Sequence, residues 1–160
     1  MLRDKKASRY LQLDPPEYYS DRLMAATGGN LAVMAQFSAF DLFNDGTLGQ
    51  SMLVQDFTAS GPVNALLYIV PVKGQFPGIG PPVLALNPLQ SQREGKISSG
   101  AVSALPAPAY SIPLGADGTC RWLHEWAVAE IPAGYSLRFV LSVLNTAFSM
   151  SWIWMIEPTY

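Results

Sequence analysis

The sequence predicts an all-β protein, an antiparallel β-sandwich preceded by a charged N-terminal arm with one short helix. Three observations indicate this fold class. After residue 30, apolar and polar side chains alternate with period two in several segments, as they do along half-buried strands. Thirteen glycines and thirteen prolines separate these segments. The single cysteine excludes an internal disulfide framework, so the fold depends on a hydrophobic core, for which 160 residues are enough.

The first 29 residues are expected to form the arm, and residues 30–160 a single sandwich domain. Asp14 is followed by two prolines. This is a helix-start pattern, because proline tolerates the first helical turn. Gly28-Gly29 would end such a helix through a left-handed cap. We therefore predict a short helix over residues 16–27.

Six strand candidates follow, separated by turns. In the first of them Leu31, Val33, Ala35 and Phe37 share one face of the expected strand. The candidates span residues 31–40, 51–58, 63–72, 83–86, 96–105 and 109–114.

The stretch KGQFPGIGPP at residues 73–82 is too rich in glycine and proline for regular structure. We predict a long exposed loop here. Its Phe76 and Ile79 would be costly to leave in water, so both are expected to contact a partner.

The last forty residues show the clearest alternation. Segments 120–130, 135–144 and 148–156 each place their large apolar residues on one face, and only turn-sized connectors separate them. We expect these three segments to form an antiparallel meander. The tryptophans among them fit a core face better than an exposed platform for stacking sugars. Eight or nine short strands fit a β-sandwich, for which a jelly roll is one arrangement.

Charge is distributed very unevenly along the chain. Ten basic and twelve acidic residues are present, and nine of these lie within the first 22 positions. The remaining 138 residues carry thirteen, whereas about one residue in four is charged in an average soluble domain. A surface so poor in charge suggests that other protein chains cover much of it. The nine are Arg3, Asp4, Lys5, Lys6, Arg9, Asp14, Glu17, Asp21 and Arg22.

Composition also argues against several classes of protein. A net charge of −2 and a pI near 5.2 disfavour a dedicated nucleic-acid binder. No apolar run reaches the roughly 18 residues that a membrane helix needs. The charged N-terminus has no apolar run behind it, so we expect no secretory signal. We expect the chain to be made in a reducing cytoplasm.

Two clusters could carry chemistry, and each has a structural interpretation. On a strand, Cys120 and His124 would lie about 13 Å apart, too far to share a proton or an ion. His124, between two tryptophans, therefore fits a packed face, with a protonation-sensitive subunit contact as a weaker alternative. Asp41, Asn44 and Asp45 could offer oxygen ligands to a cation, but Asp45-Gly46 fits a hairpin turn better. We expect no metal, cofactor or catalytic residue.

The chain resembles the virion accessory proteins of tailed bacteriophages, and in particular the head decoration (cement) proteins. The matching features are the charged arm at residues 1–22, the sandwich pattern from Leu31 onward, and the closing stretch EIPAGYSLRFVLSVLNTAFSMSWIWMIEPTY at residues 130–160. The resemblance implies a homo-oligomer, often a trimer, made in the host cytoplasm. It would sit on a capsid lattice with no catalytic activity.

In that role the arm would dock on neighbouring virion proteins. Its apolar residues would serve as anchors and its basic residues would meet acidic surface. A receptor- or carbohydrate-binding module of a phage tail or fibre is the alternative function, and a small β-sandwich hydrolase using His124 or Glu125 is a third. The expected arm contacts are Arg3, Lys5, Lys6, Arg9, Leu11, Leu13, Tyr18 and Tyr19.

Overall fold

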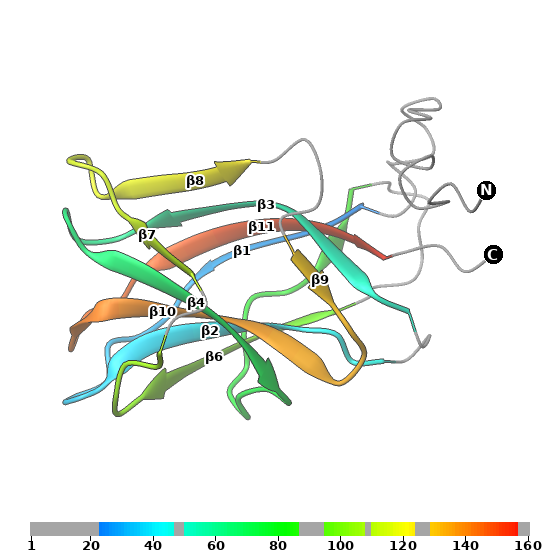
Figure 1. The fold of residues 1–160 in the computed structure, drawn as a ribbon, viewed down its shortest axis with the longest axis horizontal. Helices are drawn as coiled ribbons and strands as arrows, with labels where there is room; N and C mark the ends of the chain where they lie inside the picture. Colours follow the sequence, from blue (N-terminus) through cyan, green and yellow to red (C-terminus); the bar gives the residue numbers. More distant parts are fainter. Residues whose placement is uncertain (1–22, 47–49, 87–94, 108–109, 124–128, 157–160) are drawn as a thin grey trace.

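The computed structural model describes residues 23–46, 50–86, 95–107, 110–123 and 129–156. These residues form eleven strands and no helix, and the strands lie in two layers (Figure 1). Their bounds are β1 Leu23–Gly29, β2 Phe37–Phe43, β3 Met52–Ser60, β4 Leu66–Lys73, β5 Leu84–Ala85, β6 Lys96–Val102, β7 Tyr110–Pro113, β8 Thr119–Leu123, β9 Ala129–Ile131, β10 Tyr135–Leu144 and β11 Ser149–Ile156.

Each layer is an antiparallel sheet. Sheet A has the order β5-β1-β11-β3-β8, and β9 also pairs with β3. Sheet B has the order β6-β2-β10-β4-β7. Four pairings relate the first half of the chain to the second half in reverse order: β1 with β11, β2 with β10, β3 with β8, and β4 with β7. The predicted all-β class and the two antiparallel sheets are confirmed.

The core lies between the two sheets. Phe40 of sheet B contacts Trp152 of sheet A edge-on, with ring centroids 5.0 Å apart. Phe57 of sheet A contacts Phe139 of sheet B in the same way, at 5.1 Å. These four rings are almost completely buried, and such edge-to-face pairs add to the free energy gained from burial alone. Trp154 is also fully buried. The prediction that this part of the C-terminal segment faces a core is confirmed.

The predicted helix over residues 16–27 is wrong over its described part. Residues 23–27 belong to β1, which pairs with β11 from Leu23↔Met155 to Gly29↔Ser149. Met24 and Ala26 are buried in the core while their neighbours are less buried, which is period two. Gly28 does not cap a helix. It lies close to Pro81, since an added Cβ at Gly28 would lie 2.7 Å from the Cβ of Pro81. Residues 16–22 lie outside the described residues, and the sandwich already begins at Leu23.

Two further predictions are corrected. Residues 31–36, expected as the start of a strand, form the loop between β1 and β2, and Leu31 is 84% exposed. The last segments form no meander, because β10 lies in sheet B whereas β8, β9 and β11 lie in sheet A. The short connector after β10 passes between the layers. Asn145 N–H donates to Gln36 O on the β2 side, and Phe148 O accepts from Asn30 N–H on the β1 side.

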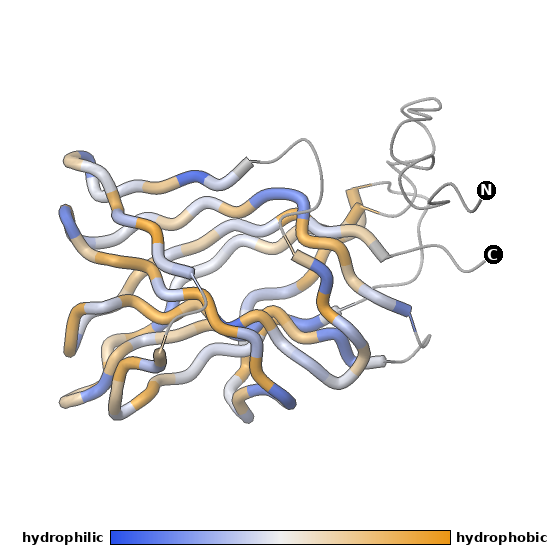
Figure 2. The backbone as a smooth tube through the Cα atoms, viewed as in Figure 1, coloured by the Kyte–Doolittle hydropathy of each residue, from blue (hydrophilic) through white to orange (hydrophobic). Residues whose placement is uncertain are grey.

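Hydrophobic segments run through both layers (Figure 2). In Figure 1, the connections β1–β2, β3–β4, β7–β8 and β10–β11 lie at the left end, and the turn after β6 lies at the lower left. Leu23, where β1 begins, and Ile156, where β11 ends, lie at the opposite end. Among the residues that the structure describes there is no helix that could cross a membrane.

Candidate functional site

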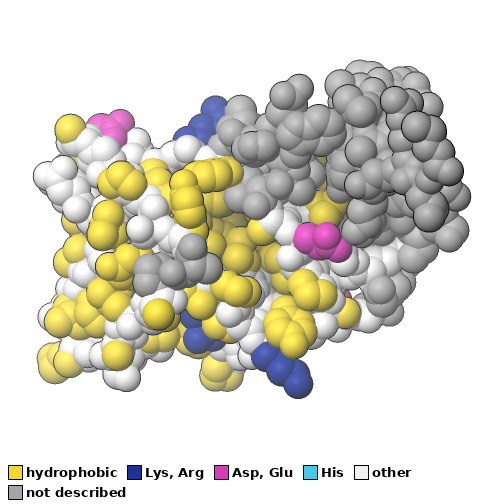
Figure 3. Space-filling model, viewed as in Figure 1, with side chains coloured by type: hydrophobic (Ala, Val, Ile, Leu, Met, Phe, Trp, Pro, Cys, Tyr) yellow, Lys and Arg dark blue, Asp and Glu magenta, His cyan; other side chains and the backbone are white. Residues whose placement is uncertain are grey.

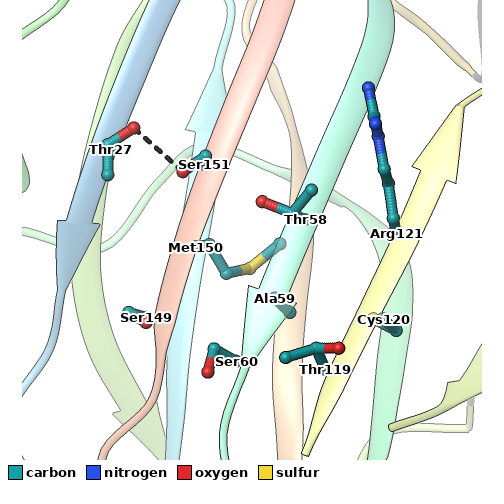
Figure 4. A pocket seen from close by; sticks show the side chains of 10 residues that line it. All are labelled: Thr27, Thr58, Ala59, Ser60, Thr119, Cys120, Arg121, Ser149, Met150 and Ser151. Carbon is teal, nitrogen blue, oxygen red and sulfur yellow. Dashed lines mark hydrogen bonds between the residues drawn. The ribbon is translucent and has the colours of Figure 1, made fainter. Parts of the chain in front are cut away.

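The outer face of sheet A carries a depression of about 410 Å³ (Figure 4). Strands β1, β3, β8 and β11 contribute side chains to it, most of them small and hydroxyl-bearing. The lining residues are Thr27, Thr58, Ala59, Ser60, Thr119, Cys120, Arg121, Ser149, Met150 and Ser151.

Strand register explains why hydroxyls gather there. Thr27 is paired with Ser151, Ser151 with Thr58, and Thr58 with Arg121, so these four residues form one row across the sheet. Residues that alternate with them, such as Met150 and Trp152, point into the core, as the period of a strand requires. Thr27 Oγ1 donates a hydrogen bond of 2.9 Å to Ser151 Oγ.

The charge at this face is partly neutralised. Arg121 Nη2 donates to Asp56 Oδ2 at 2.9 Å, with the arginine side chain 62% exposed and the aspartate side chain 11% exposed. Burial raises the pKa of the Cys120 thiol, which keeps it in the poorly nucleophilic protonated form. The lining can donate and accept hydrogen bonds, but its described residues include no carboxylate or imidazole to transfer a proton.

A second polar cluster lies on the outer face of sheet B. Asp41 on β2 is completely buried. It accepts two hydrogen bonds of 2.8 Å from Nε and Nη2 of Arg138 on β10, and one of 2.9 Å from the Phe76 backbone N–H. The Arg138 guanidinium also lies 3.7 Å from the centroid of the Phe76 ring. The Nε and Nη2 atoms of the guanidinium bond the Asp41 carboxylate, and one face of the guanidinium packs on the Phe76 ring. Since Phe76 belongs to the loop at residues 74–83, this cluster holds that loop on sheet B.

The same loop runs past the edge strand β6. An added Cβ at Gly78 or Gly80 would collide with the carbonyl oxygens of Ser99 and Ile97, so the loop backbone needs glycine for this approach. Ser99 Oγ donates to Ile79 O at 2.8 Å. The loop therefore covers an edge that would otherwise be open to pairing with another strand.

The four connections at the left of Figure 1 form a third candidate, which we call the loop end. It comprises residues 30–36, 61–65, 114–118 and 145–148 together with Leu144, the last residue of β10. Figure 3 shows hydrophobic and uncharged side chains over much of this part of the molecule. The exposed large apolar residues of the loop end are Leu31, Val33, Met34, Val63 and Leu144.

Hydrogen bonds between the loops hold the loop end together. Gly61 N–H donates to Gly118 O at 2.8 Å, and Ala35 N–H donates to Asn145 Oδ1 at 2.5 Å. Positive φ angles occur at Ala35, Asn64 and Asn145, and these are all the non-glycine cases among the described residues. An alanine in this region costs about 1–2 kcal/mol, so neighbouring interactions must hold it there.

The structure places the sequence-predicted residues as follows. Phe76 is packed under Arg138, whereas Ile79 in the same loop is 94% exposed. Asp41 and Asn44, considered as cation ligands, have protein partners: Arg138 for the first, and the carbonyls of Gln50 and Ile131 for the second.

The other predicted residues lie outside the described part of the chain. They are the arm contacts Arg3, Lys5, Lys6, Arg9, Leu11, Leu13, Tyr18 and Tyr19, together with His124 and Glu125. Sequence reasoning missed the loop end, since it assigned residues 31–36 to a strand. No neighbouring residue in the sequence indicates that Leu31 and Met34 are exposed.

No protein-family model matches the chain, and neither a curated protein nor a solved structure shows significant similarity to it.

Proposed function

We propose that this chain is a structural protein of a virus particle, a capsid decoration (cement) subunit. It would stabilise the particle through contacts with sister chains and through its N-terminal docking arm. It would be made in the host cytoplasm, act in the virion, and use no cofactor. The observation that carries the proposal is a surface with few charges and exposed apolar loops on a well-packed sandwich.

The described residues include only nine charged side chains. Four of them are used in the pairs Asp41–Arg138 and Asp56–Arg121. A surface with few ionised groups loses little hydration free energy when another protein covers it, and interface cores are depleted in charge. Meanwhile Leu31, Met34 and Ile79 are each more than 80% exposed. Clusters of exposed apolar side chains mark interaction sites.

The strand pairing supports the same proposal. The four pairings between the two halves of the chain are those expected of one long hairpin wound into two sheets, and on this ground we propose a jelly-roll arrangement. Viral capsid domains and lectins both use this arrangement. The architecture is therefore compatible with either role, and the low surface charge supports the proposal of a virion role.

The arm deletion tests the function. Residues 1–22 precede β1, so their removal leaves every described strand intact. We expect the truncated chain to unfold at the same denaturant concentration as the full chain, but to be lost from the particle fraction when virus stocks are separated on a density gradient. Incorporation equal to that of the full chain would defeat the docking arm. Absence of the full chain from the particle band would defeat the proposal as a whole.

A carbohydrate-binding module of a tail or fibre is the second candidate. The hydroxyl-lined depression on sheet A favours it, because hydroxyl groups and Arg121 can hydrogen-bond to a sugar. Among the described residues, however, no aromatic ring lines the depression, and aromatic stacking is what an apolar sugar face requires. Binding of the isolated protein to a glycan array, lost in Arg121→Ala and Thr58→Ala, would favour this candidate over the structural one.

A further inference from the structure

The loop end combines high exposure with an almost complete lack of charge. Leu31 and Met34 are 84% and 89% exposed, and Val63 is 56% exposed. Asp117 is the one ionisable side chain among residues 30–36, 61–65, 114–118 and 145–148. All four loops are within the described residues. Residues 103–107 leave β6 at the same end, because Val102 is paired with Phe37, and they also carry no charge.

The exposed side chains are held in place before any partner binds. The backbone of residues 30–36 is bonded to that of residues 145–148 at both ends, through Asn30–Phe148 and Gln36–Asn145. The remaining two loops are joined by the Gly61–Gly118 hydrogen bond, and an added Cβ at Gly61 would lie 3.3 Å from Phe148. Ordered loops lose less entropy on association, which favours binding.

The chemistry of the end selects among possible partners. A lipid surface would require Lys or Arg to meet anionic headgroups, or Trp and Tyr to sit at the interface. The four loops contain none of these residue types. A second copy fits better: in a two-fold contact each surface meets its own image, so any charge would face a like charge. The loop end carries one charge, Asp117, and its apolar surface apart from that residue is complementary to itself.

We propose that the loop end is a self-association interface, at which Leu31 and Met34 of one chain pack against the loop end of a second copy. This rests on the proposed function as an assembly subunit and assigns one of its partners. The charged arm joins the sandwich at Leu23, the opposite end of β1 from the 30–36 loop. The two ends are therefore free to make different contacts: the loop end with a sister chain, the arm end with the particle.

The test is the association constant of the full chain measured by sedimentation equilibrium. Leu31→Glu and Met34→Glu place like charges in the interface, and each substitution counts twice in a two-fold contact. We expect the double variant to raise the dissociation constant at least about tenfold. Leu84→Glu is the matched control, because Leu84 is 59% exposed but lies on β5, outside the loop end; it should leave association unchanged. Unfolding curves should coincide for all three proteins, since each replaced side chain is exposed.

Each outcome bears on the proposal. A wild-type chain that stays monomeric up to about 1 mM would overturn it, as would an oligomer that the double variant leaves intact. Flotation of the monomer with neutral phosphatidylcholine vesicles, abolished by the double variant, would overturn it in favour of a lipid partner. The proposed function is tested separately. If the chain associates through the loop end but is never found in the virus particle band, the self-association interface is supported and the virion role is contradicted.

Discussion

Arg138 of β10 and Asp41 of β2 form a two-point ion pair on the outer face of sheet B, although 97 positions separate them in the sequence. The aspartate is completely inaccessible to solvent and the arginine side chain is 20% exposed. Phe76 completes the cluster, because its backbone N–H donates to Asp41 and its ring lies under the guanidinium. The pair thus joins two neighbouring strands and a long loop.

Removing the arginine should be costly. Arg138→Ala leaves the Asp41 carboxylate buried with one remaining partner, and an uncompensated buried charge typically costs about 3–5 kcal/mol. Arg138→Lys should recover only part of this loss, since an ammonium group cannot replace both the Nε and the Nη2 hydrogen bonds or stack on the Phe76 ring. Urea unfolding of the three proteins measures the difference.

The exposed pair is the matched control. Arg121 also bonds an aspartate, Asp56, but is itself 62% exposed, and such pairs contribute about 1 kcal/mol or less. We expect Arg121→Ala to shift the urea midpoint much less than Arg138→Ala. Equal losses in the two variants would contradict the view that the Asp41 cluster fastens the loop.

Gly100 should tolerate no side chain while Phe76 is in place. An added Cβ would lie 2.6 Å from Cδ1 of the Phe76 ring. Gly100→Ala should therefore cost about 1–3 kcal/mol, as overpacking generally does. The double variant Gly100→Ala with Phe76→Ala should lose less than the sum of the single variants, because the collision is gone.

Gly29→Ala is the control for this prediction. An added Cβ there meets only Phe148 O at 3.8 Å, which is ordinary contact. Its unfolding free energy should stay close to that of the wild type. A loss as large as that of Gly100→Ala would show that alanine is disfavoured in these strands for reasons other than the collision.

Local alternation could be predicted because it depends on consecutive residues. Residues 135–144 were expected as a strand and form β10 with the same bounds. In the last segment, Met150, Trp152 and Trp154 were placed on one face and are all buried. A period of two places such residues on one side whatever their partner strand is.

Pairing and contacts could not be predicted, because they depend on residues far apart. The β1 segment contains Met and Ala, which suit a helix as well as a strand, and its pairing with β11 decides the outcome. A short connector is compatible with a hairpin or with a crossing between sheets, which is why the meander prediction failed. Thr27 and Ser151 share a hydrogen bond across 124 positions, and neither has a neighbour in sequence that would indicate it.

Asp117 should titrate below the ordinary aspartate range. Hydrogen bonds from the Thr119 side chain and backbone N–H lower its pKa from the ordinary value of 3.8. A carboxyl group with a depressed pKa stabilises the fold at higher pH, and that contribution disappears as the pH falls through its folded-state pKa. Carbon chemical shifts followed by NMR should show the pKa of Asp117 rising in Thr119→Ala. An unchanged pKa in that variant would show that the threonine side chain has no influence on it.

Cys120 should react slowly while the protein is folded. Its side chain is half-buried, faces the core side of β8, and has a pKa raised from 9.0 by burial. Because the thiolate is the reactive form, modification by a disulfide reagent at pH 8 should be at least about tenfold slower than in the urea-unfolded chain.

The raised pKa also means that the unfolded chain ionises first, so the fold should lose stability as the pH rises above 9. Cys120→Ser should remove both the slow reaction and this thiol-dependent alkaline loss. Reaction of the native thiol as fast as that of the unfolded chain would show that Cys120 is open to solvent.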